Sequence, residues 1–237
     1  MPALCFTLMK ILTIDTSTTC CSVALTDGER LVGELLLNAD RKLGGRLIGL
    51  VDTLLRESGW STADLDGFGV ALGPGSFTGL RVGVATVKGL ALATGKPAVG
   101  FSSLAMLALN LPWADAPVCS LFDARKGEVY AGLYHCRELP VPLQPDRVLP
   151  PEKLLEELTG PTLFIGEGAL RYRELIVTRL GDSAHFAPPH LHPPRAAAGA
   201  MLALQALRAG NVPPLAQLNP RYIRPSEAEL ALQKKRA

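Results

Sequence analysis

The sequence predicts an α/β protein with mixed sheets, built from two copies of one strand–helix pattern. Short apolar runs typical of strands alternate with longer amphipathic runs typical of helices. An Asp27-Gly28 dipeptide between two strand-like runs indicates an early antiparallel hairpin. The order of three strands, a helix, a strand and a helix (βββαβα) occurs in the first half of the chain and recurs in the second.

The first copy begins with three strands, predicted at residues 10–16, 22–26 and 30–37. A helix is predicted at residues 46–56, because Leu47, Leu50, Val51, Leu54 and Leu55 recur at helical spacing. The remaining elements are a strand at 68–72, a long helix at 77–94, a strand at 98–101 and a short helix capped by Ser102-Ser103.

The second copy repeats this order with less regular spacing. Its predicted elements are strands at 118–123, 127–135 and 147–149, a helix from Pro151 through Leu158, a strand at 162–165 and a helix at 169–180. A further alanine-rich helix is predicted at 195–209. We therefore expect two domains, residues 1–105 and residues 106–237, the second ending in a basic tail.

Composition limits the classes of protein that this chain can represent. A hydrophobic content of 48% over 237 residues is ample for a full core, and a net charge of +2 is lower than a dedicated nucleic-acid binder would carry. The sequence contains no run of eighteen or more apolar residues, so it predicts no membrane-spanning helix. The five cysteines are odd in number and irregularly spaced, which favours reduced, buried thiols in a cytoplasmic protein.

Residues 73–83, GPGSFTGLRVG, form the most informative motif of the chain. They join a predicted strand to a long helix, and Ser76 or Thr78 can cap that helix. Gly79 and Gly83 lie four residues apart and therefore on one helix face. The motif is either an anion cradle at a helix N-terminus or a helix face on which another backbone packs closely.

The packing interpretation explains more residues than the anion cradle does. The motif matches neither the P-loop nor the G-x-G-x-x-G pattern. A glycine inside a helix costs up to about 1 kcal/mol relative to alanine, so several of them indicate a compensating close contact. The predicted contact stripe consists of Gly79, Gly83, Thr86, Val87 and Leu90.

Two other polar segments are candidate ligand contacts. Asp15, Thr16 and Ser17 end the first strand, where a carboxylate and hydroxyls either face phosphate and magnesium or satisfy their own turn. Arg125 and Glu128 lie at a predicted hairpin turn, which is either a salt-bridged loop or a polar surface facing a ligand.

The sequence predicts no catalytic constellation. The four histidines, His135, His185, His190 and His192, lack the spacing of a metal-binding helix, and a metal site in the proline-rich loop that holds the last three has little support. The G-x-S-x-G pattern of serine hydrolases is also missing.

Residues 10–18, 73–83 and 123–130 together resemble the bacterial TsaB (YeaZ) family, and the resemblance covers nearly the whole chain from Met9. It implies the actin/Hsp70/sugar-kinase-like fold, with two RNase-H-like domains. It also implies a part in making threonylcarbamoyladenosine, the modified adenosine next to the anticodon of certain tRNAs.

The resemblance further implies a non-catalytic subunit that binds and activates a TsaD-type paralogue, which transfers the threonylcarbamoyl group. A TsaE-type ATPase would dock on this pair, and tRNA would be reached through the complex. No cofactor is expected on this chain itself, and ATP or ADP with magnesium could bind at a complex interface. The helices at 46–56 and 77–94 would pair with the same helices of the paralogue, or of a second copy when the chain is alone. The expected interface residues are Leu47, Leu50, Val51, Leu54, Gly79, Gly83, Thr86, Val87 and Leu90. We expect Gly79→Leu or Gly83→Leu to abolish partner binding and leave the monomer folded.

Two other functions compete with this one. An independent nucleotide-binding ATPase or small-molecule kinase of the same fold would use Asp15, Thr16, Ser17 and Ser76, with Arg125 and Glu128 facing them. A metallopeptidase is disfavoured by the missing metal histidines.

Overall fold

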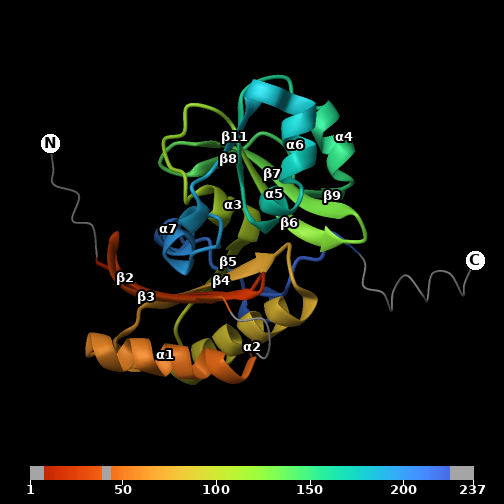
Figure 1. Cartoon of the computed structure of the whole chain (residues 1–237). Helices are drawn as coiled ribbons and strands as arrows, with labels where there is room; N and C mark the ends of the chain where they lie inside the picture. Colours follow the sequence, from red (N-terminus) through yellow and green to blue (C-terminus); the bar gives the residue numbers. More distant parts are fainter. Residues whose placement is uncertain (1–7, 39–43, 225–237) are drawn as a thin grey trace, which may run out of the picture.

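The computed structural model describes residues 8–38 and 44–224. They form two stacked lobes, each built on one mixed sheet (Figure 1). The first sheet contains β1 (Lys10–Asp15), β2 (Cys20–Asp27), β3 (Arg30–Asn38), β4 (Gly67–Gly73) and β5 (Ala98–Ser102), in the order β3-β2-β1-β4-β5. The hairpin turn at Gly28 joins β2 to β3, as predicted, and Gly28 adopts a positive φ of 59°.

Two long helices cover one face of the first sheet, α1 (Gly44–Ser58) and α2 (Phe77–Thr94) (Figure 1). Their apolar side chains form one core with the sheet, which includes Leu47, Val51, Val84 and Val87. An amphipathic helix gains most of its stability from burying such a face. A short 3₁₀ turn, η1 (Thr62–Asp64), connects α1 to β4.

The second lobe repeats the topology of the first. Its sheet contains β6 (Val118–Arg125), β7 (Glu128–Cys136), β8 (Pro140–Pro142), β10 (Thr162–Ile165) and β11 (Ala184–Phe186), in the order β11-β10-β6-β7-β8, while β9 (Arg147–Leu149) also pairs with β7. In both lobes a hairpin strand and a parallel strand flank the first strand. The predicted duplication is therefore confirmed at the level of strand order.

Helices cover both faces of the second sheet. One face carries α3 (Ser103–Ala108). The other carries α4 (Pro151–Glu156), α5 (Glu167–Arg171) and α6 (Arg173–Leu180). The single helix predicted at 169–180 is wrong, because Tyr172, with φ −103° and ψ 18°, interrupts it. The short strands β8 and β11 were not predicted, and each has only three residues.

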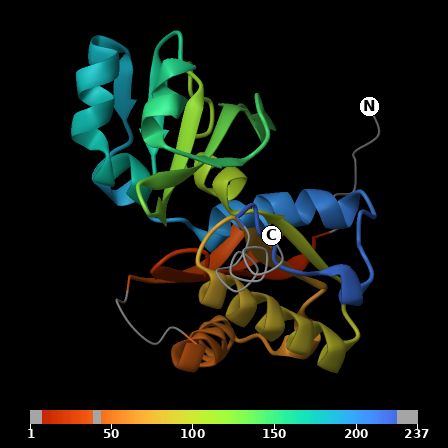
Figure 2. The ribbon, with the colours of Figure 1, turned by 90° about the vertical axis from the view of Figure 1, so that its right-hand side faces the viewer.

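The expected division into residues 1–105 and 106–237 needs correction. Helix α7 (Ala196–Arg208) returns to the first lobe and packs on the face of its sheet opposite α1 and α2 (Figure 2). Leu215 and Leu218 also belong to the core of the first lobe. The first lobe therefore includes the chain from Ala196 to about Leu218, and the basic tail beyond Arg224 lies outside the described residues.

Two further findings bear on the predictions from composition. No helix among residues 8–38 and 44–224 is long and apolar enough to cross a membrane. The four cysteines in the described part of the chain, Cys20, Cys21, Cys119 and Cys136, are buried free thiols, and burial raises the pKa of each.

Candidate functional site

The turn after β1 is enclosed within the first lobe. Asp15, Thr16 and Ser17 are each at most 1% exposed. One carboxylate oxygen of Asp15 accepts a hydrogen bond from the Ser17 N–H at 3.1 Å. Burial raises the pKa of Asp15 to about 6, and the hydrogen bonds from Ser17 and Thr16 only partly offset that effect. The other carboxylate oxygen of Asp15 and the Ser17 hydroxyl are buried without a hydrogen-bond partner among the described residues, so the turn satisfies its own polar groups only in part and both alternatives stay open.

The N-terminus of α2 closes over the same turn. Ser76 caps α2 through a side-chain oxygen that accepts the Gly79 N–H, and the Ser76 N–H donates to the Ser17 carbonyl oxygen at 2.7 Å. Thr16 Oγ1 donates to the Gly79 carbonyl oxygen at 2.7 Å. The kinase alternative assigns Thr16, Ser17 and Ser76 to phosphate. In the structure, the Thr16 hydroxyl, the Ser17 carbonyl oxygen and Ser76 form hydrogen bonds that join the β1–β2 turn to the start of α2.

The predicted role of Gly79 and Gly83 at a partner surface is wrong. A Cβ atom on Gly79 would overlap the Thr16 carbonyl oxygen, and one on Gly83 would overlap Thr16 Oγ1. Both glycines are buried against their own chain. The close contact that the motif predicts therefore exists, but its partner is the β1–β2 turn of the same molecule.

The other residues of the predicted interface also face inward. Val87, Leu47, Val51 and Leu54 lie in the core of the first lobe, and Leu50, Thr86 and Leu90 are half-buried. The reason is general, because the apolar face of an amphipathic helix binds its own sheet first. A partner on α1 and α2 would contact the residues that alternate with the buried ones, together with the exposed parts of Leu50, Thr86 and Leu90.

The outward face of α1 and α2 carries a second set of small residues, none of which the sequence analysis assigned to the interface. Gly45 and Gly49 on α1, and Gly89 on α2, have open space where a Cβ atom would lie. Two large apolar side chains accompany them: Ile48 is 57% exposed and Leu92 is 78% exposed. We name this surface the α1–α2 outer face and define it by Gly45, Ile48, Gly49, Ala85, Gly89 and Leu92.

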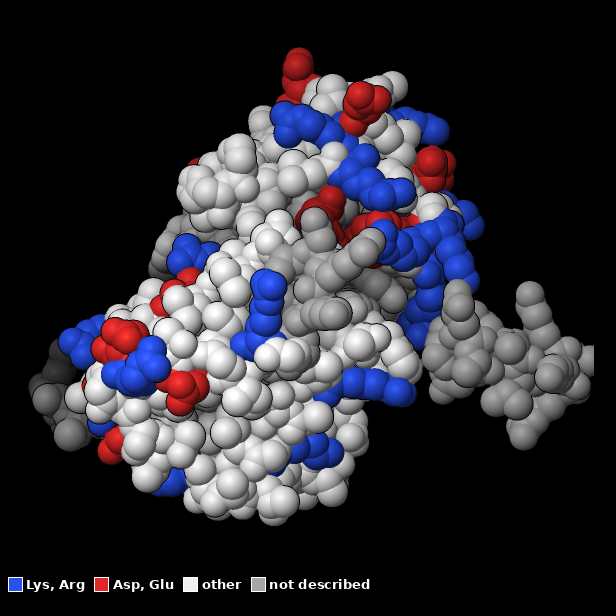
Figure 3. All heavy atoms as spheres, turned by 60° about the horizontal axis from the view of Figure 1, so that its bottom comes forward, with Lys and Arg blue, Asp and Glu red and all other residues white. Residues whose placement is uncertain are grey.

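The residues that define the α1–α2 outer face are uncharged, but α1 also exposes Arg46, Asp52, Arg56 and Glu57 beside them. In Figure 3, which brings the helix side of the first lobe forward, large areas carry neither acidic nor basic side chains. Single apolar residues are common on protein surfaces, but a contiguous apolar area with a low profile is typical of an interaction site. The repeat of small residues four positions apart, Gly45 with Gly49 and Ala85 with Gly89, was the available signal in the sequence.

The turn between β6 and β7 gathers charged groups in the second lobe. Asp123 accepts a hydrogen bond from the Arg125 N–H and forms ion pairs with Arg125 and Arg171. Arg125 and Lys126 both adopt positive φ, 64° and 54°. Glu128 pairs with Arg224 instead of Arg125. The two predicted contact residues, Arg125 and Glu128, therefore share a turn but hold separate ion pairs.

His192 is the buried histidine of the loop that the sequence analysis considered for metal. Its Nδ1 accepts the Gly166 N–H at 3.0 Å, and Nε2 lies 3.0 Å from the Ala187 carbonyl oxygen, to which it donates. Burial lowers the pKa of His192. Both ring nitrogens are thus occupied by backbone groups. Within residues 8–38 and 44–224, no group of three or more His, Cys, Asp or Glu residues could hold a metal ion.

Comparison with known proteins identifies the relatives of the chain. Residues 37–232 match the family model described as TsaD: tRNA N6-adenosine threonylcarbamoyltransferase. The chain is 33% identical over 225 residues to the tRNA threonylcarbamoyladenosine biosynthesis protein TsaB of Bacillus subtilis, covering 93% of this chain and 96% of that protein.

Solved structures agree with this relationship. YeaZ from Pseudomonas aeruginosa superposes with a TM-score of 0.78 at 30% identity, covering 91% of this chain and all of that one. The ROK hexokinase of Thermus thermophilus superposes with a TM-score of 0.51 at 14% identity, which shows the fold alone. The predicted actin/Hsp70/sugar-kinase-like fold is therefore confirmed.

Proposed function

The chain belongs to the TsaB (YeaZ) family, and we propose that it is the non-catalytic scaffold subunit that binds and activates a TsaD-type threonylcarbamoyltransferase. Its part in the synthesis of tRNA threonylcarbamoyladenosine follows from the relatives, which carry that process in their names. The finer role, binding and activation of the transferase, is our proposal and depends on the α1–α2 outer face.

The observation that carries this proposal is an exposed, low-profile helix pair. Leu92 and Ile48 project from it, and the open positions at Gly49 and Gly89 leave room for the side chains of a second helix pair. Burying a leucine side chain contributes about 1.5–3 kcal/mol of favourable free energy, and the exposed Leu92 of a monomer does not gain it. Burial of Leu92 in an interface would therefore favour association.

The family model supports the identity of the proposed partner. A model built for the TsaD-type transferase matches this chain over residues 37–232, a range that includes both helices of the outer face. A partner of the same fold would present the same two helices. Pairing like with like would give a pseudo-two-fold contact of four helices, as in isologous dimers. In the free chain the same face offers a contact for a second copy.

The enclosed β1–β2 turn supports an accessory role. In a kinase or ATPase of this fold, Asp15 and its neighbours would have to reach phosphate and magnesium. Here the carboxylate is fully buried, and Thr16 and Ser76 are hydrogen-bonded across the turn. No contact among the described residues favours the independent kinase over the scaffold. Docking of a TsaE-type ATPase, with ATP or ADP and magnesium at a complex interface, stays part of the proposal.

Reconstitution with one protein left out at a time tests the proposed function. The assay measures threonylcarbamoyladenosine formed on tRNA by the TsaD-type partner, with and without this chain and the ATPase. We expect modification to require this chain together with the partner, and this chain alone to give none. Full activity of the partner and ATPase without this chain would contradict the proposal. Modification by this chain alone would contradict its non-catalytic assignment.

A further inference from the structure

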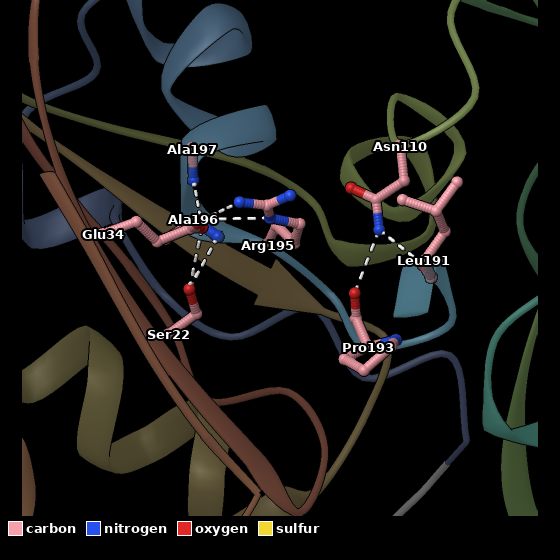
Figure 4. Close-up of polar contacts among 8 residues, drawn as sticks. All are labelled: Ser22, Glu34, Asn110, Leu191, Pro193, Arg195, Ala196 and Ala197. Carbon is pink, nitrogen blue, oxygen red and sulfur yellow. Dashed lines mark hydrogen bonds and ion pairs between the residues drawn. The ribbon is translucent and has the colours of Figure 1, made fainter. Parts of the chain in front are cut away.

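Between β1 and α7 the described chain passes twice between the two lobes, and the two passages are held together. The first leads from β5 into α3, where Ser102 Oγ donates to Asp146 of the second lobe at 2.6 Å. The second leads through Pro193 into α7. Asn110, just after α3, donates to the carbonyl oxygens of Leu191 and Pro193 at 2.8 and 2.9 Å (Figure 4). These passages form one hinge region, in which α3 also packs against the first lobe because Met106 shares a core with Ala203 and Leu204 of α7.

The second passage is also anchored firmly to the first sheet. Glu34 of β3 accepts hydrogen bonds from the Arg195 side chain and from the Ala197 N–H, both at 2.9 Å (Figure 4). Ser22 of β2 accepts the Ala196 N–H at 2.9 Å. The start of α7 therefore moves with the first lobe, and the residues before Arg195 are left to absorb any motion between the lobes.

A third connection between the lobes, residues 218–224, lies apart from this hinge. After Leu218, which is buried in the first core, the Arg221 N–H donates to the Leu72 carbonyl oxygen at the end of β4 at 2.7 Å. Tyr222 stacks on Phe77 with ring centroids 4.8 Å apart, and its hydroxyl accepts from Arg81 Nε at 2.9 Å. Residues 218–222 are thus fixed to the first lobe.

Two residues later the same segment is bound to the second lobe. Arg224 Nη1 donates to the carbonyl oxygen of Ala124, and its other terminal nitrogen forms an ion pair with Glu128. Both acceptors belong to the β6–β7 hairpin. Two residues of extended chain span at most about 7 Å. While both ends hold, the hairpin cannot move far from the start of α2.

We propose that residues 218–224 are a latch that holds the two lobes at one angle and that opens when Arg224 releases the β6–β7 hairpin. The interaction is charge-assisted and only partly buried, the side chains of Arg224 and Glu128 being 20% and 33% exposed. It is therefore strong enough to select one arrangement and exposed enough to be released. Domains joined by a compact hinge move relative to each other unless a contact restrains them.

Distance measurement between the lobes tests the latch. Nitroxide labels are placed at Glu57→Cys on α1 and Asp182→Cys near α6, both exposed, in a chain that also carries Cys5→Ser. The four cysteines of the described chain are buried, so the labels react at the introduced sites. Double electron–electron resonance then gives the distribution of distances between the lobes.

The test compares Arg224→Gln and Glu128→Gln with Arg208→Gln as the matched control. Arg208 also forms a surface ion pair, with Glu29, but both of these residues lie within the first lobe. We expect a single narrow distribution in the parent chain and the control, and a second, shifted population in the two latch variants. The shift should be smaller for Glu128→Gln, which retains the bond to Ala124.

Unchanged distributions in both latch variants would overturn the proposal, and so would an equal shift in the control. Circular dichroism and thermal melts establish that each variant is folded, and Glu128→Gln decides the matter if Arg224→Gln does not fold. The measurement uses the free chain. Its outcome is therefore independent of whether the proposed TsaD-type partner binds.

Discussion

The Thr16 hydroxyl donates a hydrogen bond to the Gly79 carbonyl oxygen at 2.7 Å, and the Thr16 carbonyl oxygen fills the space where a Gly79 side chain would lie. This relationship explains why the most informative motif of the sequence contains glycine at that position. The first turn of α2 rests directly on the turn that follows β1, with no room for a side chain between them. The motif therefore allows the start of α2 to pack directly on the β1–β2 turn of the first lobe.

Replacement of Gly79 by alanine should destabilise the chain. The new Cβ atom would overlap backbone, which cannot move as a side-chain tip can, so we expect a loss of about 2–3 kcal/mol in the free energy of unfolding. Gly89→Ala is the matched control, since its Cβ would meet open space in the same helix. That variant should gain up to about 1 kcal/mol from helix propensity. Urea denaturation measures both.

Equal stability of the two alanine variants would show that Gly79 does not pack as described. The sequence analysis expected Gly79→Leu and Gly83→Leu to leave the monomer folded, and the packing of both glycines contradicts that expectation. Because both positions are enclosed by Thr16, these variants should fail to fold stably and should not remain folded monomers that lack only partner binding.

Asp15 should make stability depend on pH in the acidic range. Burial raises its pKa in the folded chain to about 6, above the ordinary value of 3.8, so the folded state favours the protonated acid. The free energy of unfolding should therefore fall as pH rises from about 4 to about 6, by on the order of 3 kcal/mol from this group. Asp15→Asn removes the titration.

The measurement is the difference in unfolding free energy between Asp15→Asn and the parent chain at pH 4 and at pH 7. As pH rises from 4 to 7, the parent chain should lose stability that Asp15→Asn keeps, so the variant should become more stable relative to the parent. Groups present in both proteins, such as His192, cancel in the comparison. A difference that does not change with pH would contradict a raised pKa for Asp15.

The sequence predicted the order of elements better than their packing. The βββαβα pattern was correct because turn residues and apolar spacing are local signals. The return of α7 to the first sheet was missed, since an alanine-rich helix fits either lobe. Gly79 and Gly83 were assigned to the partner interface and the equally small Gly49 and Gly89 were not, because small residues occur on both faces of these helices. Only the folded chain determines which face meets the sheet.

Glu34 should be a major contributor to the placement of α7. Its side chain is only 6% exposed and bonds Arg195, the Ala197 N–H and the Ser22 hydroxyl. In Glu34→Ala the Arg195 guanidinium, which is 42% exposed, and the half-buried Ala197 amide would lose their acceptor, at a cost of about 1.5–3 kcal/mol. Glu29→Ala, which breaks the exposed pair with Arg208, should cost about 1 kcal/mol or less. Comparable losses in the two variants would contradict this account, and urea denaturation distinguishes them.

His192 should titrate below its ordinary pKa of 6.5, because burial disfavours the charged ring. In the folded chain the neutral ring accepts the Gly166 N–H through Nδ1. Protonation would remove that acceptor. The neutral ring therefore stabilises the fold above pH 6.5, and this contribution is lost as pH falls below that value. Nitrogen-15 NMR of the imidazole should find the proton on Nε2 at pH 7. A proton on Nδ1, or a pKa above 6.5, would refute the assignment.

The affinity for the TsaD-type partner tests the central claim, that the α1–α2 outer face seats another protein. Leu92→Asp places a charge on that face, whereas Val177→Asp makes the same change at a 46% exposed position on α6, at the far end of the molecule (Figure 1). Calorimetry should find the partner bound at least about 30-fold more weakly by Leu92→Asp and equally well by Val177→Asp. Equal affinity of Leu92→Asp and the parent chain would contradict the account.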